Sequence, residues 1–125
     1  MLRVSTCKVR IEGENLANAI KQSSLLSKTA ETTSTRSEAA KFLVSEKFFR
    51  IVSEDENQDK VIAKPTCEVL GSGTADSTFA IDQLLAIKSI LGKSKEVTLG
   101  LGMNQSMVMD LSVDEMAIKY FMKTR

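Results

Sequence analysis

Residues suited to catalysis are scarce in this chain. Histidine is absent from all 125 residues, which removes the commonest general base and the commonest metal ligand together. Cys7 and Cys67 lie far apart and form no Cys-x-x-Cys motif, a pattern typical of buried thiols in a reducing compartment. We therefore expect a protein that is not an enzyme and that holds no cofactor and no metal ion.

Two other motifs are better explained by structure than by chemistry. The acidic run at residues 54–59 does not match the calcium-loop spacing D-x-[DN]-x-[DN]-G and lacks its glycine, so we interpret it as a solvated hairpin turn. Gly100 and Gly102 lie inside a predicted strand rather than between a strand and a helix. That position favours a bend or a bulge over a phosphate-binding loop.

The composition is that of an ordinary globular protein. Hydrophobic residues make up 42% of the chain and charged residues 26%, and the length suits a single domain over residues 1–125. No apolar run approaches the roughly 20 residues that cross a bilayer, and the N-terminus lacks a signal-peptide pattern. We expect a protein with no membrane partner, located in the cytoplasm (nucleoid-associated) or in the nucleus.

Apolar periodicity predicts strands and helices in a regular order. Pro65 limits one predicted strand to a sheet edge or breaks it. Asp82 is the expected N-cap of the second helix, and Gly92 is expected to end that helix. The predicted strands are 4–11, 40–45, 48–53, 60–70, 78–81, 97–101, 107–113 and 117–122, and the predicted helices are 14–28 and 83–91.

This order predicts an α+β fold built from a duplicated βαβββ unit, with half-units at about 1–70 and 77–125. Two such half-units would be related by a pseudo-twofold axis, with both helices on one face of antiparallel sheets. A weak sequence echo agrees, because Ala-Ile-Lys occurs at residues 19–21 and again at residues 86–88.

The second half carries motifs of a known family. They are Phe79-Ala80-Ile81, the leucine-rich segment 84–91, Glu96-Val97-Thr98-Leu99 and the closing Ile118-Lys119-Tyr120-Phe121. In this stretch the chain resembles the DNA sliding clamps, the family of proliferating cell nuclear antigen. The proline that usually follows the closing motif is missing, and so is the linker that joins consecutive clamp domains.

The resemblance implies a scaffold that encloses duplex DNA without reading its sequence and recruits a DNA polymerase or other replication or repair proteins. Six domains close a ring in that family, so a one-domain chain implies a homo-oligomer. An alternative is a non-ring clamp mimic that binds a clamp, a polymerase or a loader as a regulator. A third possibility, an unrelated ligand-binding or catalytic α+β domain, would require a deep pocket with convergent polar groups.

The net charge of +1 means that any contact with DNA depends on where the lysines point. Lys21 and Lys28 are seven residues apart and are expected on one exposed stripe of the first helix. Lys88 is expected on the flank of the second helix, and Lys93 and Lys95 after its end. We predict that these five lysines face DNA; the alternatives are solvated charges and cations placed at negative helix ends.

The resemblance also implies a groove for partner peptides, formed by Val44, Tyr120, Phe121 and Met122. Strand alternation predicts that Phe121 faces one way and its two neighbours the other. The alternative is that all four are ordinary core residues. The segments 60–70 and 117–123 are the candidates for edge strands that pair between subunits, although edge lysines can discourage such pairing.

Overall fold

The computed structural model describes residues 7–24, 39–45, 48–54, 60–70 and 73–124. These residues form nine strands and two helices. In chain order the elements are β1 (Cys7–Glu12), α1 (Gly13–Ser23), β2 (Ala39–Ser45), β3 (Phe48–Glu54), β4 (Lys60–Ala63), β5 (Cys67–Leu70), β6 (Thr74–Ala80), α3 (Ile81–Lys93), β7 (Glu96–Leu101), β8 (Met107–Val113) and β9 (Met116–Met122).

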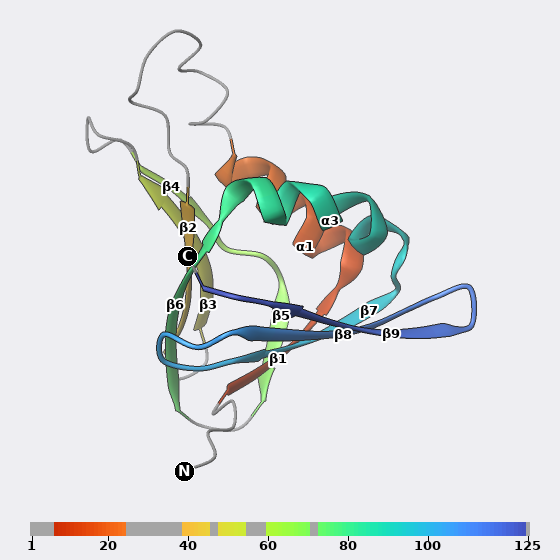
Figure 1. Ribbon diagram of the computed structural model, residues 1–125. Coiled ribbons are helices and arrows are strands. Elements are labelled where there is room, and N and C mark those ends of the chain that lie inside the picture. Colours follow the sequence, from red (N-terminus) through yellow and green to blue (C-terminus); the bar gives the residue numbers. More distant parts are fainter. Residues whose placement is uncertain (1–6, 25–38, 46–47, 55–59, 71–72, 125) are drawn as a thin grey trace, which may run out of the picture.

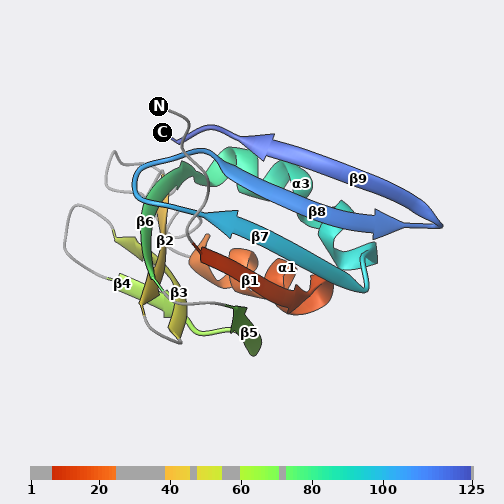
Figure 2. The ribbon, with the colours of Figure 1, turned by 90° about the horizontal axis from the view of Figure 1, so that it is seen from below.

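The strands form two antiparallel sheets. A five-stranded sheet has the order β5-β1-β7-β8-β9, and a four-stranded sheet has the order β4-β3-β2-β6. The five-stranded sheet extends beneath both helices, and the four-stranded sheet stands at their side (Figure 1). Seen from below, β1, β7, β8 and β9 lie in front of the helices (Figure 2). The expected α+β fold with two helices and antiparallel sheets is confirmed.

Side-chain alternation explains which face of each strand is buried. Val9 and Ile11 of β1 are buried, while Lys8 and Arg10 are exposed. In β8 the buried side chains, Met107, Met109 and Leu111, likewise occupy every second position. The inward side chains of both sheets join with those of the helices in one core.

The two helices lie side by side and start in the same way. Each follows its preceding strand directly, at Gly13 and Ile81, and neither N-terminus has a side-chain cap. A Cβ on Gly13 would lie 2.1 Å from the carbonyl oxygen of Leu91 and 2.2 Å from that of Ser94. Only glycine permits this approach, which places the first turn of α1 beside the end of α3 (Figure 1).

An aromatic cluster fills the inner face of the four-stranded sheet. Phe42 packs edge-on against Phe49 and Phe79, with ring centroids 5.8 Å and 5.2 Å apart. The buried Ser53 hydroxyl donates a 2.8 Å hydrogen bond to the Ser23 carbonyl, which ties β3 to the end of α1.

A polar corner joins the two sheets. The Ser77 hydroxyl donates to the Gly102 carbonyl over 2.8 Å and accepts the Gln105 amide over 3.0 Å. The Asp76 amide donates to the same Gly102 carbonyl over 3.1 Å. This corner fixes β6 of one sheet against the connection between β7 and β8 of the other.

The second helix differs from its expected bounds. It starts at Ile81, so Ala80 rather than Asp82 occupies the N-cap position. It also continues through Gly92 to Lys93, because Gly92 is exposed and adopts a helical conformation that a glycine tolerates at modest cost. The first helix is described from Gly13 to Ser23, and the Ser23 and Ser24 hydroxyls donate to carbonyls of its last turn. Residues 25–28 of the predicted helix lie outside the described residues.

Pro65 breaks the strand expected at 60–70, as predicted. The segment separates into β4 and β5, and each becomes the edge of a different sheet. A tight turn joins β8 to β9, since Asp114 and Glu115 have φ angles of 51° and 66° that suit a short hairpin loop. The predicted turn at residues 46–47 and most of the acidic run lie outside the described residues.

Candidate nucleic-acid interface and partner surfaces

The exposed side of α1 carries one of the predicted DNA-facing lysines. Lys21 is exposed and lies on a stripe with Glu14 and Asn18, at the spacings of three and four residues that bring side chains together. Lys28, its expected partner on that stripe, lies outside the described residues. The described part of the stripe is therefore polar with one charge of each sign.

The two predicted DNA-facing lysines of α3 differ in how far they are exposed. Lys93 is exposed on a stripe with Asp82 and Ser89. Lys88 is only half-exposed and lies between Leu84 and Leu91, which are fully buried. The expected position of Lys88 is on the flank of this helix, and the flank it occupies is the partly buried one, because a residue at the i+4 position from Leu84 shares the face of that leucine.

Lys95 is exposed just after the end of α3. The Gly13 amide donates to the Lys95 carbonyl over 3.4 Å, so the start of α1 lies beside Lys95. The helix layer thus brings Lys93 and Lys95 to one end, where Glu14 also lies, and Lys21 to the last turn of α1.

The charges on both helices also agree with the alternative explanation, in which charged side chains are placed to oppose the helix dipole. Glu14 and Asp82 lie in the first turns, and Lys21 and Lys93 in the last turns. Each charge therefore opposes the partial charge of its own helix end, an arrangement that stabilises a surface helix by about 0.3–1 kcal/mol per residue. The layer offers cations to a phosphate backbone only in alternation with carboxylates.

The predicted partner groove does not form from its four residues. Val44 and Met122 are 1% exposed and belong to the core, so their expected place on a groove wall is wrong. Val44 faces inward from the four-stranded sheet, between Phe49 and Ala75. Both residues lie at inward-facing positions of their strands, so their side chains pack in the core and do not line a surface groove.

The two remaining groove residues lie on opposite faces of β9, as strand alternation predicts. Phe121 is 63% exposed on the outer face, opposite Val108. Tyr120 is half-buried on the inner face and lines an apolar hollow of about 90 Å³ between α3 and the β8–β9 hairpin. The other lining residues are Ile87, Ile90, Leu91, Met109, Leu111 and Ile118.

Further apolar surface is exposed near this hollow and the sheet edge. Ile90, which lines the hollow, is 43% exposed, and Met116, the first residue of the edge strand β9, is 63% exposed. Sequence reasoning missed Ile87 and Ile90, whose signal is a pair of isoleucines displaced from the buried stripe of Leu84 and Leu91. An apolar surface next to the edge strand β9 suits contact with another protein.

A second hollow, of about 420 Å³, lies on the outer face of the four-stranded sheet. Its lining residues are Ala39, Lys41, Leu43, Arg50, Val52, Lys60, Ile62 and Thr78. Sequence reasoning missed this surface, although alternation in β2 and β3 places Lys41, Leu43, Arg50 and Val52 on one face once the two strands pair.

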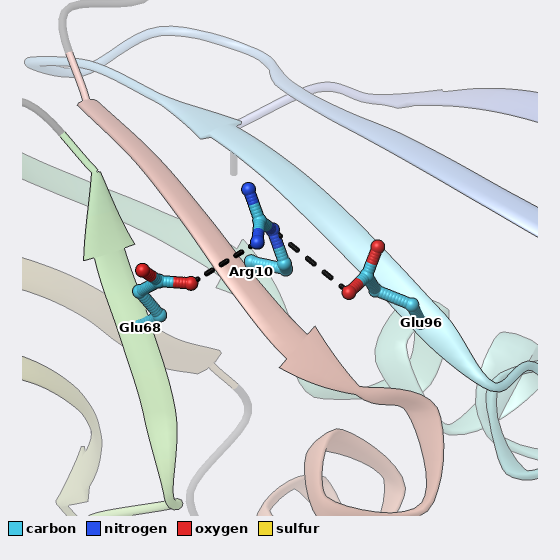
Figure 3. A network of polar contacts seen from close by, with 3 residues as sticks. All are labelled: Arg10, Glu68 and Glu96. Carbon is cyan, nitrogen blue, oxygen red and sulfur yellow. Dashed lines mark ion pairs between the residues drawn. The ribbon is translucent and has the colours of Figure 1, made fainter.

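The outer face of the five-stranded sheet carries ion pairs between neighbouring strands. Arg10 of β1 contacts Glu68 of β5 over 3.2 Å and Glu96 of β7 over 3.8 Å (Figure 3). Lys119 of β9 contacts Asp110 of β8 over 3.7 Å. These pairs are half-exposed or more, so each contributes at most about 1 kcal/mol to stability.

The described side chains form no group of three or more His, Cys, Asp or Glu suited to a metal ion. Neither cysteine is in a disulfide, and burial raises the pKa of the Cys67 thiol, which keeps it protonated at neutral pH. Among the described helices, none is long and apolar enough to cross a membrane. No protein-family model matches this chain, and no curated protein matches it either.

Proposed function

We propose that this chain is a sliding-clamp-like scaffold, a processivity protein that associates with duplex DNA without sequence specificity and recruits replication or repair proteins. The observation that carries the proposal is the side-by-side packing of α1 and α3 in one layer over the sheets. A cytoplasmic (nucleoid-associated) or nuclear place follows from such a role.

The strand order supports a duplicated unit behind this layer. The correspondence matches each element of the first half with one of the second half: β1 with β6, α1 with α3, β2 with β7, β3 with β8 and β4 with β9. When the two halves are exchanged in this way, the strand order β1-β7-β8-β9 becomes β6-β2-β3-β4, which is the order of the other sheet. The β1–β7 and β2–β6 pairings then exchange with each other, and both are antiparallel. Only β5 has no counterpart. A pseudo-twofold axis between the helices explains this correspondence.

DNA binding in this proposal is electrostatic. The exposed Lys21, Lys93 and Lys95 contact phosphates from the helix layer. Lys28, the other lysine predicted on the first helix, lies outside the described residues. Lys88 contributes less, because it is half-buried between leucines. A protein that contacts phosphates alone has no means of reading base edges, so it can occupy any sequence.

Assembly of several copies in this proposal uses the sheet edges. β9 and β5 end the five-stranded sheet, and β4 ends the other. A second copy that pairs with β9 would also cover the exposed Ile90 and Met116. The outward Phe121 is the remaining candidate to anchor a partner protein.

The proposal is tested by binding a labelled duplex over a range of salt concentrations. Reversing three charges, with Lys21→Glu, Lys93→Glu and Lys95→Glu, should lower affinity at least about tenfold and flatten the dependence of log K on log salt by about 0.9 per lost phosphate contact. The control is Lys8→Glu on the outer face of the five-stranded sheet. Equal binding by both variants would remove the helix layer as the DNA surface.

The alternative, a non-ring mimic that binds a clamp, a polymerase or a loader, is favoured by one observation. Glu14 and Asp82 share the layer with the lysines, so the surface is not uniformly basic. The mimic predicts that the triple charge reversal leaves DNA association unchanged while it weakens binding to the protein partner.

A further inference from the structure

The outer face of the four-stranded sheet combines unpaired cations with an apolar centre. Lys41 and Lys60 are exposed and Arg50 is half-buried, and none of the three makes an ion pair with a side chain that the structure describes. On the other sheet, by contrast, Arg10 and Lys119 both contact carboxylates.

The pairing register places these side chains in one cluster. Val52 of β3 lies opposite Lys41 of β2 on one side and opposite Ile62 of β4 on the other. Arg50 lies opposite Leu43 in the neighbouring row. The apolar centre of Leu43, Val52 and Ile62 is therefore flanked by cations on β2, β3 and β4, and Ile62 is 48% exposed.

The acidic residues near this cluster lie at its margins. Among the side chains that the structure describes, Asp76 is the acidic residue on this face, and it lies at the β6 edge opposite Leu43. Glu54, the last residue of β3, pairs opposite Lys60 at the other margin. Arg50 is also held in place, because its guanidinium lies 5.3 Å from the centroid of the exposed Phe48 ring. A fixed guanidinium is suited to bidentate contact with a carboxylate.

We propose that this face binds an acidic peptide segment of a partner protein, in which carboxylates flank one or two bulky apolar side chains. The apolar side chains would sit on Leu43, Val52 and Ile62, in the hollow of about 420 Å³, and the carboxylates would pair with Lys41, Arg50 and Lys60. The site lies on the sheet face turned away from α1, because Ser53, of opposite parity to Val52, bonds the end of that helix. It therefore does not depend on DNA binding by the helix layer.

A peptide fits this surface better than a nucleic acid does. A phosphate backbone would satisfy the three cations but would leave the apolar centre against a charged, hydrated chain. A peptide with a central apolar group covers the centre and desolvates the surrounding charge pairs, which strengthens them.

The test uses a fluorescein-labelled peptide of sequence Gly-Asp-Asp-Phe-Leu-Asp-Glu-Gly and fluorescence anisotropy with the intact chain. We expect saturable, salt-sensitive binding with amide shifts in heteronuclear NMR spectra confined to β2, β3 and β4. The peptide with amides in place of its carboxylates, and the peptide with serines in place of Phe and Leu, should each bind at least about fivefold more weakly.

Variants then locate the site. Lys41→Glu with Lys60→Glu should weaken the acidic peptide at least about tenfold, whereas Lys8→Glu with Lys123→Glu, at exposed positions elsewhere, should not. Ile62→Ser should weaken binding about fivefold without changing its salt dependence, since the lost contact is uncharged. Circular dichroism confirms that each variant is folded.

Three outcomes would overturn the proposal. They are no peptide binding at millimolar concentration, equal binding by the two double variants, and a labelled oligothymidylate that binds this face more tightly than the peptide does. The last result would assign the face to single-stranded nucleic acid.

Discussion

The two halves of the chain share an order of elements but end differently. Each half runs from a strand directly into a helix and then into further strands. In the first half Pro65 separates β4 from β5, and the two short strands enter different sheets. In the second half β9 continues unbroken for seven residues. Proline has no amide hydrogen to donate to a ladder, so one residue is enough to divide a segment between two sheets.

The outer surfaces of the two sheets differ more than their frameworks do. The five-stranded sheet neutralises Arg10 and Lys119 with carboxylates on neighbouring strands. The four-stranded sheet leaves Lys41, Arg50 and Lys60 without an ion pair to a side chain that the structure describes. Inward positions are constrained by a shared core, so the outer faces of the two sheets differ at their outward positions.

The largest expected effect is the difference in unfolding free energy between glycine-to-alanine substitutions in the two helices. Gly13→Ala should cost about 3 kcal/mol of unfolding free energy or prevent folding, because its Cβ would overlap the Leu91 and Ser94 carbonyls. Gly92→Ala should instead add up to about 1 kcal/mol, since nothing lies within 4 Å of the new Cβ. Urea unfolding of both variants gives the comparison. Similar values would show that the helices are not in close contact at Gly13.

A smaller effect contrasts two serines of the four-stranded sheet, one that ties it to the other sheet and one that ties it to α1. Ser77→Ala removes one donated and one accepted hydrogen bond at the corner between the sheets. Ser53→Ala removes a single bond to the Ser23 carbonyl. We expect losses of about 2 and about 1 kcal/mol in thermal or urea unfolding. If Ser53→Ala were the more damaging, the corner at Gly102 would not be what joins the sheets.

The charges on the outer faces should matter little for stability. Arg10→Ala should cost less than about 1 kcal/mol, because its contacts with Glu68 and Glu96 are exposed to solvent, and moderate salt should remove most of the difference. Lys41→Ala, which breaks no ion pair with a described residue, should change unfolding by less than about 0.5 kcal/mol. A large loss in Lys41→Ala would mean that this face is already occupied within the chain.

The smallest effect concerns the thiol on β5. Burial raises the pKa of Cys67 above its unfolded value, so its contribution to stability is complete below the unfolded pKa and is lost as pH rises through the folded pKa. Iodoacetamide should therefore alkylate Cys67 in the folded chain more slowly than in urea. Mass spectrometry of the Cys7→Ala variant isolates the site, and equal rates would contradict the burial of β5 against the core.

Much of the fold follows from local pattern. Alternation accounts for the buried positions of β8 and separated Phe121 from its neighbours, and the missing amide of Pro65 broke its strand. The ends of α3 were predicted less well, because tertiary packing rather than the capping preferences of Asp82 and Gly92 determines where the helix starts and ends. The aligned Ala-Ile-Lys echo also fails, since Ala19 is the seventh residue of α1 and Ala86 is the sixth of α3.

The candidate sites were harder to predict because they depend on neighbours across sheets. Val44 and Met122 lie at inward positions of their strands and belong to the core, and the family motifs contain no information on that alternation. The basic hollow gathers residues from three strands, and its cations become a cluster only once register is known. Single-strand patterns contain no such information.

The central claim is that this chain assembles around duplex DNA. Analytical ultracentrifugation over a range of concentrations, with and without a duplex, tests it most directly. The account predicts a mass of several chains, approaching six copies as concentration rises, and cosedimentation with DNA that added salt weakens. A single-chain mass at every concentration, with no DNA in the boundary, would contradict it.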